Sequence, residues 1–186
     1  MKLSIIISST RASRKGPAVA QWVESVVRES ALFEVVEVVD LKKLNLPFMD
    51  EPKHPNLQQY THQHTKDWSA QIDSSSAFIF VTAEYNHGIP APLKNAIDYL
   101  SKEWANKPLA IVGYGGISGG TRAIQQLKQI ASAVKLHAFD GVILPFFSKQ
   151  IDEDGVFQAT AHNRIAADKM VQELAQLARS YQVFRV

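Results

Sequence analysis

The segment VTAEYNHGIPAPLKNAIDYL, residues 81–100, joins an apolar run to a helical pattern through a loop rich in polar side chains. Pro92 stands where the first turn of a helix tolerates proline, and apolar residues recur behind it at helical spacing. Before it come an acid, a phenol, an amide and an imidazole at positions 84–87, and then Gly88. A connector between a strand and a helix needs only a turn and a cap. The density of functional groups therefore predicts that this loop binds a ligand.

The composition predicts a single domain, residues 1–186, because 46% of the residues are hydrophobic and the chain is too short for two comfortable cores. The longest apolar runs, 77–81 and 109–112, are far shorter than the roughly 18 residues of a membrane span. Basic residues follow the N-terminal apolar run where a signal peptide would need small ones, so that run is predicted as a strand. We therefore expect no membrane association.

The charge and the cysteine content exclude further classes of function. The net charge is +2, which gives no reason to expect a nucleic-acid surface. The chain has no cysteine, so disulfides, thiolate metal sites and cysteine nucleophiles are excluded. The same absence is compatible with a reducing compartment, and a cytoplasmic location is the expectation.

Apolar runs and helical patterns alternate along the chain. Strands are predicted at 2–8, 33–39, 77–82, 108–113 and 141–144. Helices are predicted from Gly16 and Pro17 onward, at 65–73, behind Pro92, on the apolar face of 124–134 and at 161–181. The segment 40–64, with three prolines, is predicted as a long irregular loop.

This alternation is typical of an α/β fold with a parallel sheet covered by helices on both faces. Ligands of such sheets bind outside the carboxyl ends of the strands. Three loops are therefore candidates for the site: the first loop (9–16), the second loop (83–91) and the third loop (114–119). The unusual residues of the chain are concentrated in these three loops.

The first loop carries hydroxyls and cations rather than glycines. The N-terminus of the following helix favours an anion, Ser9 can donate hydrogen bonds, and Arg11 or Arg14 supplies charge, which together suit a phosphate monoester. The glycine spacing of a dinucleotide site is absent, and Lys15 is followed by Gly16 rather than by the serine or threonine of a triphosphate loop. The alternative is that the serines cap the helix and the basic residues are solvated surface.

The second loop can present backbone groups, an amide and a phenol to the edge of a flat heterocycle, and Gly88 allows a turn that a side chain would obstruct. Gly115 and Gly116 of the third loop have no side chains, so that loop can lie close to one end of the same ring. A phosphate at one end and a ring held between two loops describe a mononucleotide cofactor.

With these motifs the chain resembles the NADPH-dependent FMN reductase family, flavodoxin-like flavoproteins that include quinone, azo-dye and chromate reductases. The resemblance covers nearly the whole chain and is carried by STRASRKGPAVAQW, LPFMDEP, AEYNHGIPAPLKNAIDYL and YGGISGGTRAIQQLKQ. It implies a three-layer sandwich with a five-stranded parallel sheet in the order 2-1-3-4-5. Two positions depart from the family pattern: Ser8 replaces a glycine, and Ala83 replaces a proline, which frees one φ angle.

The resemblance also implies which residues hold FMN. Phosphate contacts are expected from Ser9, Arg11 and Arg14, helped by the helix start at Gly16, Pro17 and Ala18. Ring contacts are expected from Glu84, Tyr85, Asn86, His87 and Gly88, and from Gly115 and Gly116.

The activity implied is that of an FMN-dependent oxidoreductase with NADPH or NADH as reductant and a small-molecule electron acceptor, such as a quinone, in a ping-pong cycle. Hydride transfer needs no protein acid or base, so no catalytic residue is assigned, although Asn86 or His87 is a candidate to protonate a product oxygen. A homodimer or homotetramer is expected, with Leu46, Phe48 and Met49 offering apolar contact.

Two other classes of function remain open on this fold: a flavodoxin-type electron carrier, and a flavin-free binding protein. The +2 net charge is unlike the acidic surface of a carrier. No metal site is expected, because His62 and His64 lack a nearby carboxylate pattern and are predicted as surface residues. Asp40 is predicted as a residue of the turn that ends the second strand.

Overall fold

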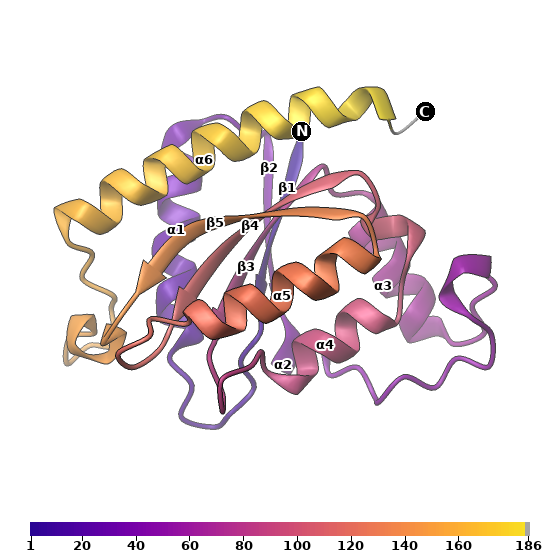
Figure 1. Cartoon of the computed structure of the whole chain (residues 1–186), viewed down its shortest axis with the longest axis horizontal. Coiled ribbons are helices and arrows are strands. Elements are labelled where there is room, and N and C mark those ends of the chain that lie inside the picture. Colours follow the sequence, from indigo (N-terminus) through magenta and orange to yellow (C-terminus); the bar gives the residue numbers. More distant parts are fainter. Residues whose placement is uncertain (185–186) are drawn as a thin grey trace.

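The computed structural model describes residues 1–184. Its centre is a five-stranded parallel sheet in the order β2-β1-β3-β4-β5 (Figure 1), so the predicted sheet and strand order are confirmed. The strands are β1 (Lys2–Ile7), β2 (Val35–Asp40), β3 (Ala77–Ala83), β4 (Lys107–Tyr114) and β5 (Leu136–Leu144).

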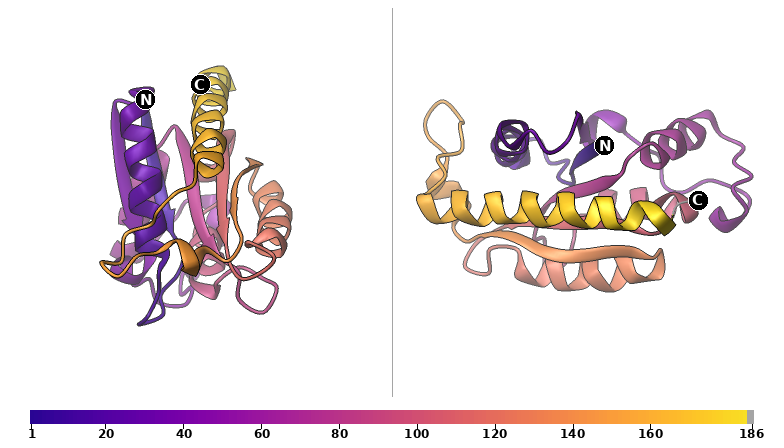
Figure 2. Two further views of the ribbon diagram at one scale, coloured as in Figure 1. Left: turned by 90° about the vertical axis from the view of Figure 1, so that its left-hand side faces the viewer. Right: turned by 90° about the horizontal axis from the view of Figure 1, so that it is seen from above.

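Helices cover both faces of the sheet, which makes three layers. The α-helices are α1 (Gly16–Ser30), α2 (Leu41–Leu44), α3 (Gln63–Asp73), α4 (Ala91–Asp98), α5 (Thr121–Ala133) and α6 (Ala161–Tyr181). Helices α1 and α6 lie side by side on one face, and the right view of Figure 2 shows β5 between α6 and α5. Within residues 1–184, no helix combines the length and the hydropathy that crossing a membrane requires.

The strands are buried because their side chains alternate between two apolar cores, as the pleat of a strand dictates. In β3, Ile79 and Val81 face α1 and α6, whereas Phe78 and Phe80 face the helices on the other side. The same parity carries Tyr114, the last residue of β4, to the α1 side of the sheet. Side chains at the strand ends therefore have a direction that the fold sets.

The last strand is longer than the apolar pattern indicates. It was expected at 141–144, but β5 begins at Leu136, and His137 and Asp140 are exposed because β5 is an edge strand. The register shifts between Ile111 and Val112, which pair with Asp140 and Val142 and leave Gly141 as an extra residue. A Cβ at Gly141 would lie 2.9 Å from the carbonyl oxygen of Ile111, so this bulge requires glycine.

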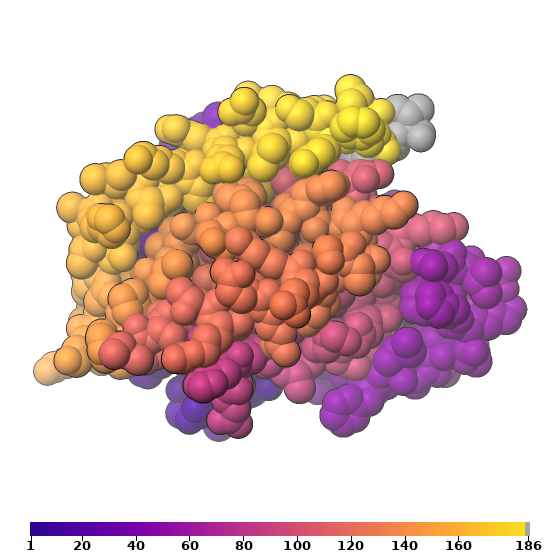
Figure 3. Space-filling model, viewed as in Figure 1, coloured from indigo at the N-terminus to yellow at the C-terminus, as the bar shows by residue number. Residues whose placement is uncertain are grey.

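The segment 40–64 is also more ordered than expected. It contains α2 and a short 3₁₀ turn, Pro55–Leu57, on either side of a proline-bearing stretch. The part between α2 and α3, residues 45–62, is called here the long loop, and it projects at one end of the molecule (Figures 1 and 3). Trp68 and Trp104, predicted as packing residues, are fully buried and meet edge to face with their ring centroids 5.9 Å apart.

Candidate functional site

The three loops that follow β1, β3 and β4 meet at one rim of the sheet, around a cavity of about 230 Å³. The cavity lies at the carboxyl ends of these parallel strands, where the sheet topology predicts a ligand. It is lined by Arg11, Ser13, Arg14, Lys15, Ala83, Glu84, Tyr85, Tyr114, Gly115, Gly116 and Phe147. Residues of all three predicted loops are therefore brought together.

The inner end of this site lies against the start of α1. Two buried hydroxyls, Ser9 Oγ and Tyr114 Oη, lie beside each other and have no other hydrogen-bond partner among the described residues. Both face Gly16, where an added Cβ would lie 2.4 Å from Ser9 Oγ and 2.6 Å from Tyr114 Oη. Buried polar groups in proteins are usually fully hydrogen-bonded, so this pair is a candidate contact for a ligand oxygen at the start of α1.

Tyr114 is suited to donate such a bond. Its ring is buried on the face of the sheet that α1 covers, and it packs against Phe147 with the ring centroids 4.7 Å apart. Burial raises the pKa of the Tyr114 phenol to about 12, although the nearby Ser9 hydroxyl acts in the opposite direction. The phenol therefore remains protonated at neutral pH.

The N-terminus of α1 adds a fixed positive field to the same place. Pro17 occupies the first turn and has no N–H, and no acidic side chain lies in that turn. The N–H of Ala18 is already donated to the carbonyl of Lys15 at 3.2 Å. Neither Pro17 nor Ala18 therefore offers a free N–H to a ligand. Gly16 leaves room for a ligand, and the helix dipole supplies partial positive charge.

The two arginines of the first loop are placed differently. The guanidinium of Arg11 is exposed and lies 5.9 Å from the centre of the Tyr85 ring, so it bridges the first and second loops. The guanidinium of Arg14 is already bonded within the protein. It donates to both carboxylate oxygens of Asp40 at 2.5 Å and to the carbonyl of Ser9 at 2.8 Å. Asp40, expected to be only a turn residue, is therefore part of the support of this loop.

The second loop is a tight two-residue turn. Tyr85 and Gly88 exchange backbone hydrogen bonds of 2.9 and 3.0 Å, and Asn86 and His87 between them have positive φ angles of 49° and 67°. Gly88 was expected to allow a turn that a side chain would obstruct, and a Cβ there would lie 2.8 Å from Gln126 Oε1. The glycine makes room for this side chain of α5, whose Oε1 accepts from the Ile89 N–H at 2.8 Å.

Glu84, which lines the cavity, joins the second loop to the third. Its carboxylate accepts hydrogen bonds from Ser118 Oγ at 2.8 Å, the Arg122 N–H at 3.0 Å and the Arg122 guanidinium at 2.8 Å. Burial opposes its charge, but these bonds and the start of α5 outweigh burial and lower the pKa of Glu84. Its role here is to position the third loop.

The third loop leaves open space at the rim. A Cβ added to Gly116 would meet nothing within 4 Å, whereas Gly115 lies close to Gly120 and to Glu84. Phe147, from the turn after β5, completes the wall. Sequence reasoning missed Phe147, Gln126 and the side chain of Tyr114, although the two-residue period of β4 could have directed attention to the last.

The two departures from the family pattern are accommodated. The Ser8 side chain is fully buried and donates to Thr82 Oγ1 at 3.4 Å, so the hydroxyl absent from glycine has a partner. Ala83 is held as the last residue of β3 by pairing with Tyr114. The strand pairing and the bonds of Glu84 restrain the backbone where a proline would have fixed it.

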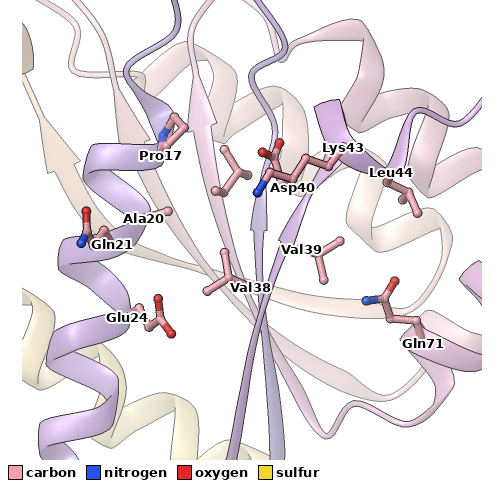
Figure 4. Close-up of a pocket in the computed structure, with 11 residues that line it drawn as sticks. Pro17, Ala20, Gln21, Glu24, Val38, Val39, Asp40, Lys43, Leu44 and Gln71 are labelled. Carbon is pink, nitrogen blue, oxygen red and sulfur yellow. The ribbon is translucent and has the colours of Figure 1, made fainter. Parts of the chain in front are cut away.

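The other candidates from the sequence lie away from this rim. His64 bonds to Asp50 at 3.0 Å and stacks on His62, and no set of three or more His, Asp or Glu side chains within residues 1–184 is arranged to hold a metal ion. A larger hollow of about 610 Å³ runs beside edge strand β2, between α1 and α2 (Figure 4). It is open, and of the residues predicted to bind the cofactor its lining contains Pro17, in the first turn of α1.

Sequence comparison identifies relatives of this chain. The profile of the NADPH-dependent FMN reductase family matches residues 1–149. An NAD(P)H-dependent FMN reductase of Schizosaccharomyces pombe is 43% identical over 137 residues, covering 73% of this chain and 68% of that protein. One of Saccharomyces cerevisiae is 34% identical over 175 residues, covering 88% of this chain and 91% of that protein.

Comparison with solved structures supports the same assignment at the level of fold. FerB, a flavoenzyme NAD(P)H:(acceptor) oxidoreductase of Paracoccus denitrificans, superposes with a TM-score of 0.72 at 17% identity, covering 97% of this chain and 98% of that one. A flavodoxin of Streptococcus pneumoniae gives a TM-score of 0.60 at 12% identity, covering 95% of this chain and 99% of that one. The flavodoxin-like fold is thus confirmed, and by its sequence this chain belongs to the NADPH-dependent FMN reductase family.

Proposed function

We propose that this protein is an FMN-dependent oxidoreductase that uses NADPH or NADH to reduce quinones, free flavin or similar small acceptors. The family membership supports the class of reaction, and relatives named as quinone reductases support the class of acceptor. The observation that carries the cofactor assignment is the pair of buried hydroxyls, Ser9 Oγ and Tyr114 Oη, that face Gly16 at the N-terminus of α1 and bond to no other group among the described residues. We further propose that residues 1–186 act as one FMN-binding domain.

The residues at the rim fit the phosphate end of FMN. Ser9 and Tyr114 would donate hydrogen bonds to the phosphate, and Arg11 and the dipole of α1 would balance its charge. The cavity of about 230 Å³ is below the roughly 300–1,000 Å³ of ordinary ligand pockets, which suits the phosphate and part of its attached chain. The flat ring then belongs over the second and third loops, where Gly116 leaves open space.

When bound, FMN supplies the redox chemistry, since a flavin can take a hydride from a reduced nicotinamide and return electrons to an acceptor. The protein contributes position and electrostatics. Asn86 and His87 are exposed in the turn at 85–88, where His87 could give a proton to a product oxygen and Asn86 could donate a hydrogen bond to it. Glu84 and Gln126 keep the second loop fixed against α5.

The function is tested by following the visible spectrum of the purified protein. We expect a yellow protein, or one that becomes yellow with added FMN, that NADPH or NADH bleaches without oxygen and a quinone recolours. A yellow protein that neither nucleotide bleaches would contradict the reductase and favour a flavodoxin-type carrier. A protein that stays colourless with FMN would favour a flavin-free binding role.

We also propose a homodimer or homotetramer. Phe48 is 86% exposed and Met49 43% exposed on the long loop, an unusual display of large apolar side chains for a monomer. Leu46 is packed against the core beside α4 instead, so it would contribute less to a contact between subunits. Light scattering on the purified protein measures the assembly, and a monomeric mass would contradict it.

A further inference from the structure

The ion pair between Arg14 and Asp40 is built into the base of the first loop. Both side chains are largely buried, with 11% and 10% of their surfaces exposed. Both nitrogens at the end of the Arg14 guanidinium donate to the two carboxylate oxygens of Asp40, each at 2.5 Å. Such a bidentate pair fixes the orientation of both groups as well as holding their charges together.

Asp40 is itself held firmly. It is the last residue of β2 and pairs in register with Ile7, the last residue of β1, directly before the first loop. Its carboxylate also accepts from the Lys42 N–H at 3.0 Å and so caps α2. In Figure 4 the side chain of Lys43 extends toward Asp40, and its charge helps to lower the pKa of that carboxyl after the larger effect of Arg14.

Arg14 connects Asp40 to the backbone of the first loop. Besides Asp40, it donates to the carbonyl of Ser9 at 2.8 Å, and its own N–H bonds to the carbonyl of Arg11 at 3.3 Å. Ser9 carries one of the two buried hydroxyls that face Gly16, and Arg11 carries the exposed guanidinium beside Tyr85. Both residues are thus tied through Arg14 to the end of β2.

We propose that Asp40 is a positioning residue for phosphate recognition, and that Arg14 braces the first loop instead of binding the phosphate. The inference rests on the proposed FMN site. In it, Asp40 contributes to FMN affinity without touching the cofactor, although its negative charge alone would repel a phosphate. The charge effect and the positioning effect of Asp40 therefore have opposite signs, and this makes them separable.

The test is to replace Asp40 with Asn and to measure the dissociation constants of FMN and of riboflavin, which lacks the phosphate. Asn retains an acceptor for the Lys42 N–H and is a good N-cap, so α2 is preserved. We expect FMN binding to weaken about tenfold while riboflavin binding is nearly unchanged. An FMN affinity that rises would overturn the proposal, because it would mean that Arg14 had been released to bind the phosphate.

Further variants separate positioning from simple stability. Arg14→Gln should weaken FMN binding at least as much as Asp40→Asn, because it also leaves the negative charge of Asp40 unpaired, and the double variant should be no worse than Arg14→Gln, because both residues act through one pair. Asp168→Asn removes one of the two carboxylates that pair with Arg164 of α6, the other being Glu29, and serves as the control, with an unchanged ratio of FMN to riboflavin affinity. If Asp40→Asn lowered the melting temperature but left the ratio of FMN to riboflavin affinity unchanged, the pair would contribute only to stability, which would contradict the proposal.

The proposed function can fail separately. If the wild-type protein bound riboflavin as tightly as FMN, the phosphate site itself would be wrong and the role of Asp40 would fall with it. If the wild-type protein preferred FMN and Asp40→Asn kept the same preference, only the positioning role would be wrong.

Discussion

At the scale of residues, Arg11 and Arg14 show how one loop divides two roles between identical side chains. Both were predicted to contact a phosphate, since each adds a cation to a hydroxyl-rich turn. Arg14 is paired with Asp40, whereas Arg11 is exposed at the mouth of the cavity and makes only weak contacts among the described residues, 3.5 Å to Ser13 Oγ and 5.9 Å to the centre of the Tyr85 ring. The direct charge for a phosphate is therefore assigned to Arg11.

Replacing Arg11 with Glu should weaken FMN binding about 100-fold, because one charge-assisted interaction is lost and a repulsion is introduced. Titration of the protein with FMN, followed by flavin fluorescence, measures the change. Arg179→Glu, on the exposed C-terminal end of α6, makes the same change of charge far from the rim and should bind FMN as the wild type does. Equal FMN affinities in the two variants would show that Arg11 makes no phosphate contact.

The residue scale also marks where sequence reasoning stops. Ser9, Arg11 and the glycines of the third loop could be predicted because they are near each other in sequence or follow strands that end at one rim. The pairing of Arg14 with Asp40 could not, because it depends on the register of β1 and β2. Likewise, Gln126 meets Gly88 only after α5 has packed against the second loop.

At the scale of elements, the C-terminal part of the long loop is anchored by a buried carboxylate, that of Glu103. Glu103, 1% exposed, accepts hydrogen bonds from Tyr60 and Gln58 of the long loop and from Ser69 of α3. Burial by itself would raise the pKa of Glu103, but the hydrogen bonds from Ser69 and Tyr60 outweigh it, so the pKa is lowered. A carboxylate with a lowered pKa stabilises the fold above its unfolded pKa and loses this contribution as the pH falls.

Glu103→Gln should therefore lower the free energy of unfolding by about 2 kcal/mol at pH 7, because hydrogen bonds to a charged acceptor become bonds to a neutral one. The difference from the wild type should shrink below a pH of about 4, where the wild-type carboxyl also becomes protonated. Urea unfolding at several pH values measures both effects, with the exposed Glu153→Gln as control. A destabilisation that does not vary with pH would contradict the assigned role of the charge.

The bounds of a helix or strand could be predicted where one apolar pattern extends over its whole length. The bounds of α6 agree with the prediction because its apolar face and its ends are clear, including the capping box at Thr160 and Asn163. Most of β5 was missed because an edge strand exposes polar residues such as His137 and Asp140, which interrupt the apolar run. The first turn of α2 was missed because it is too short to have a period and depends on its cap by Asp40.

At the scale of the whole molecule, the arrangement of the sheet explains why the three loops meet at one rim. Parallel strands bring the ends of β1, β3 and β4 to the same edge, and side-chain parity directs Tyr114 toward α1. Family membership and fold followed from motifs in these same loops, so they could be predicted from the sequence. Which residues are free to contact a phosphate and which only support the loops depends on how the chain packs, so it could not be predicted from the sequence.

The most direct test of the FMN site is a crystal structure determined from crystals of the protein grown in the presence of FMN. We expect the phosphate at the N-terminus of α1, within hydrogen-bond distance of Ser9 Oγ and Tyr114 Oη, with Arg11 beside it and Arg14 still paired with Asp40. A flavin bound in the hollow beside β2, or a phosphate that leaves both hydroxyls without a partner, would contradict the account.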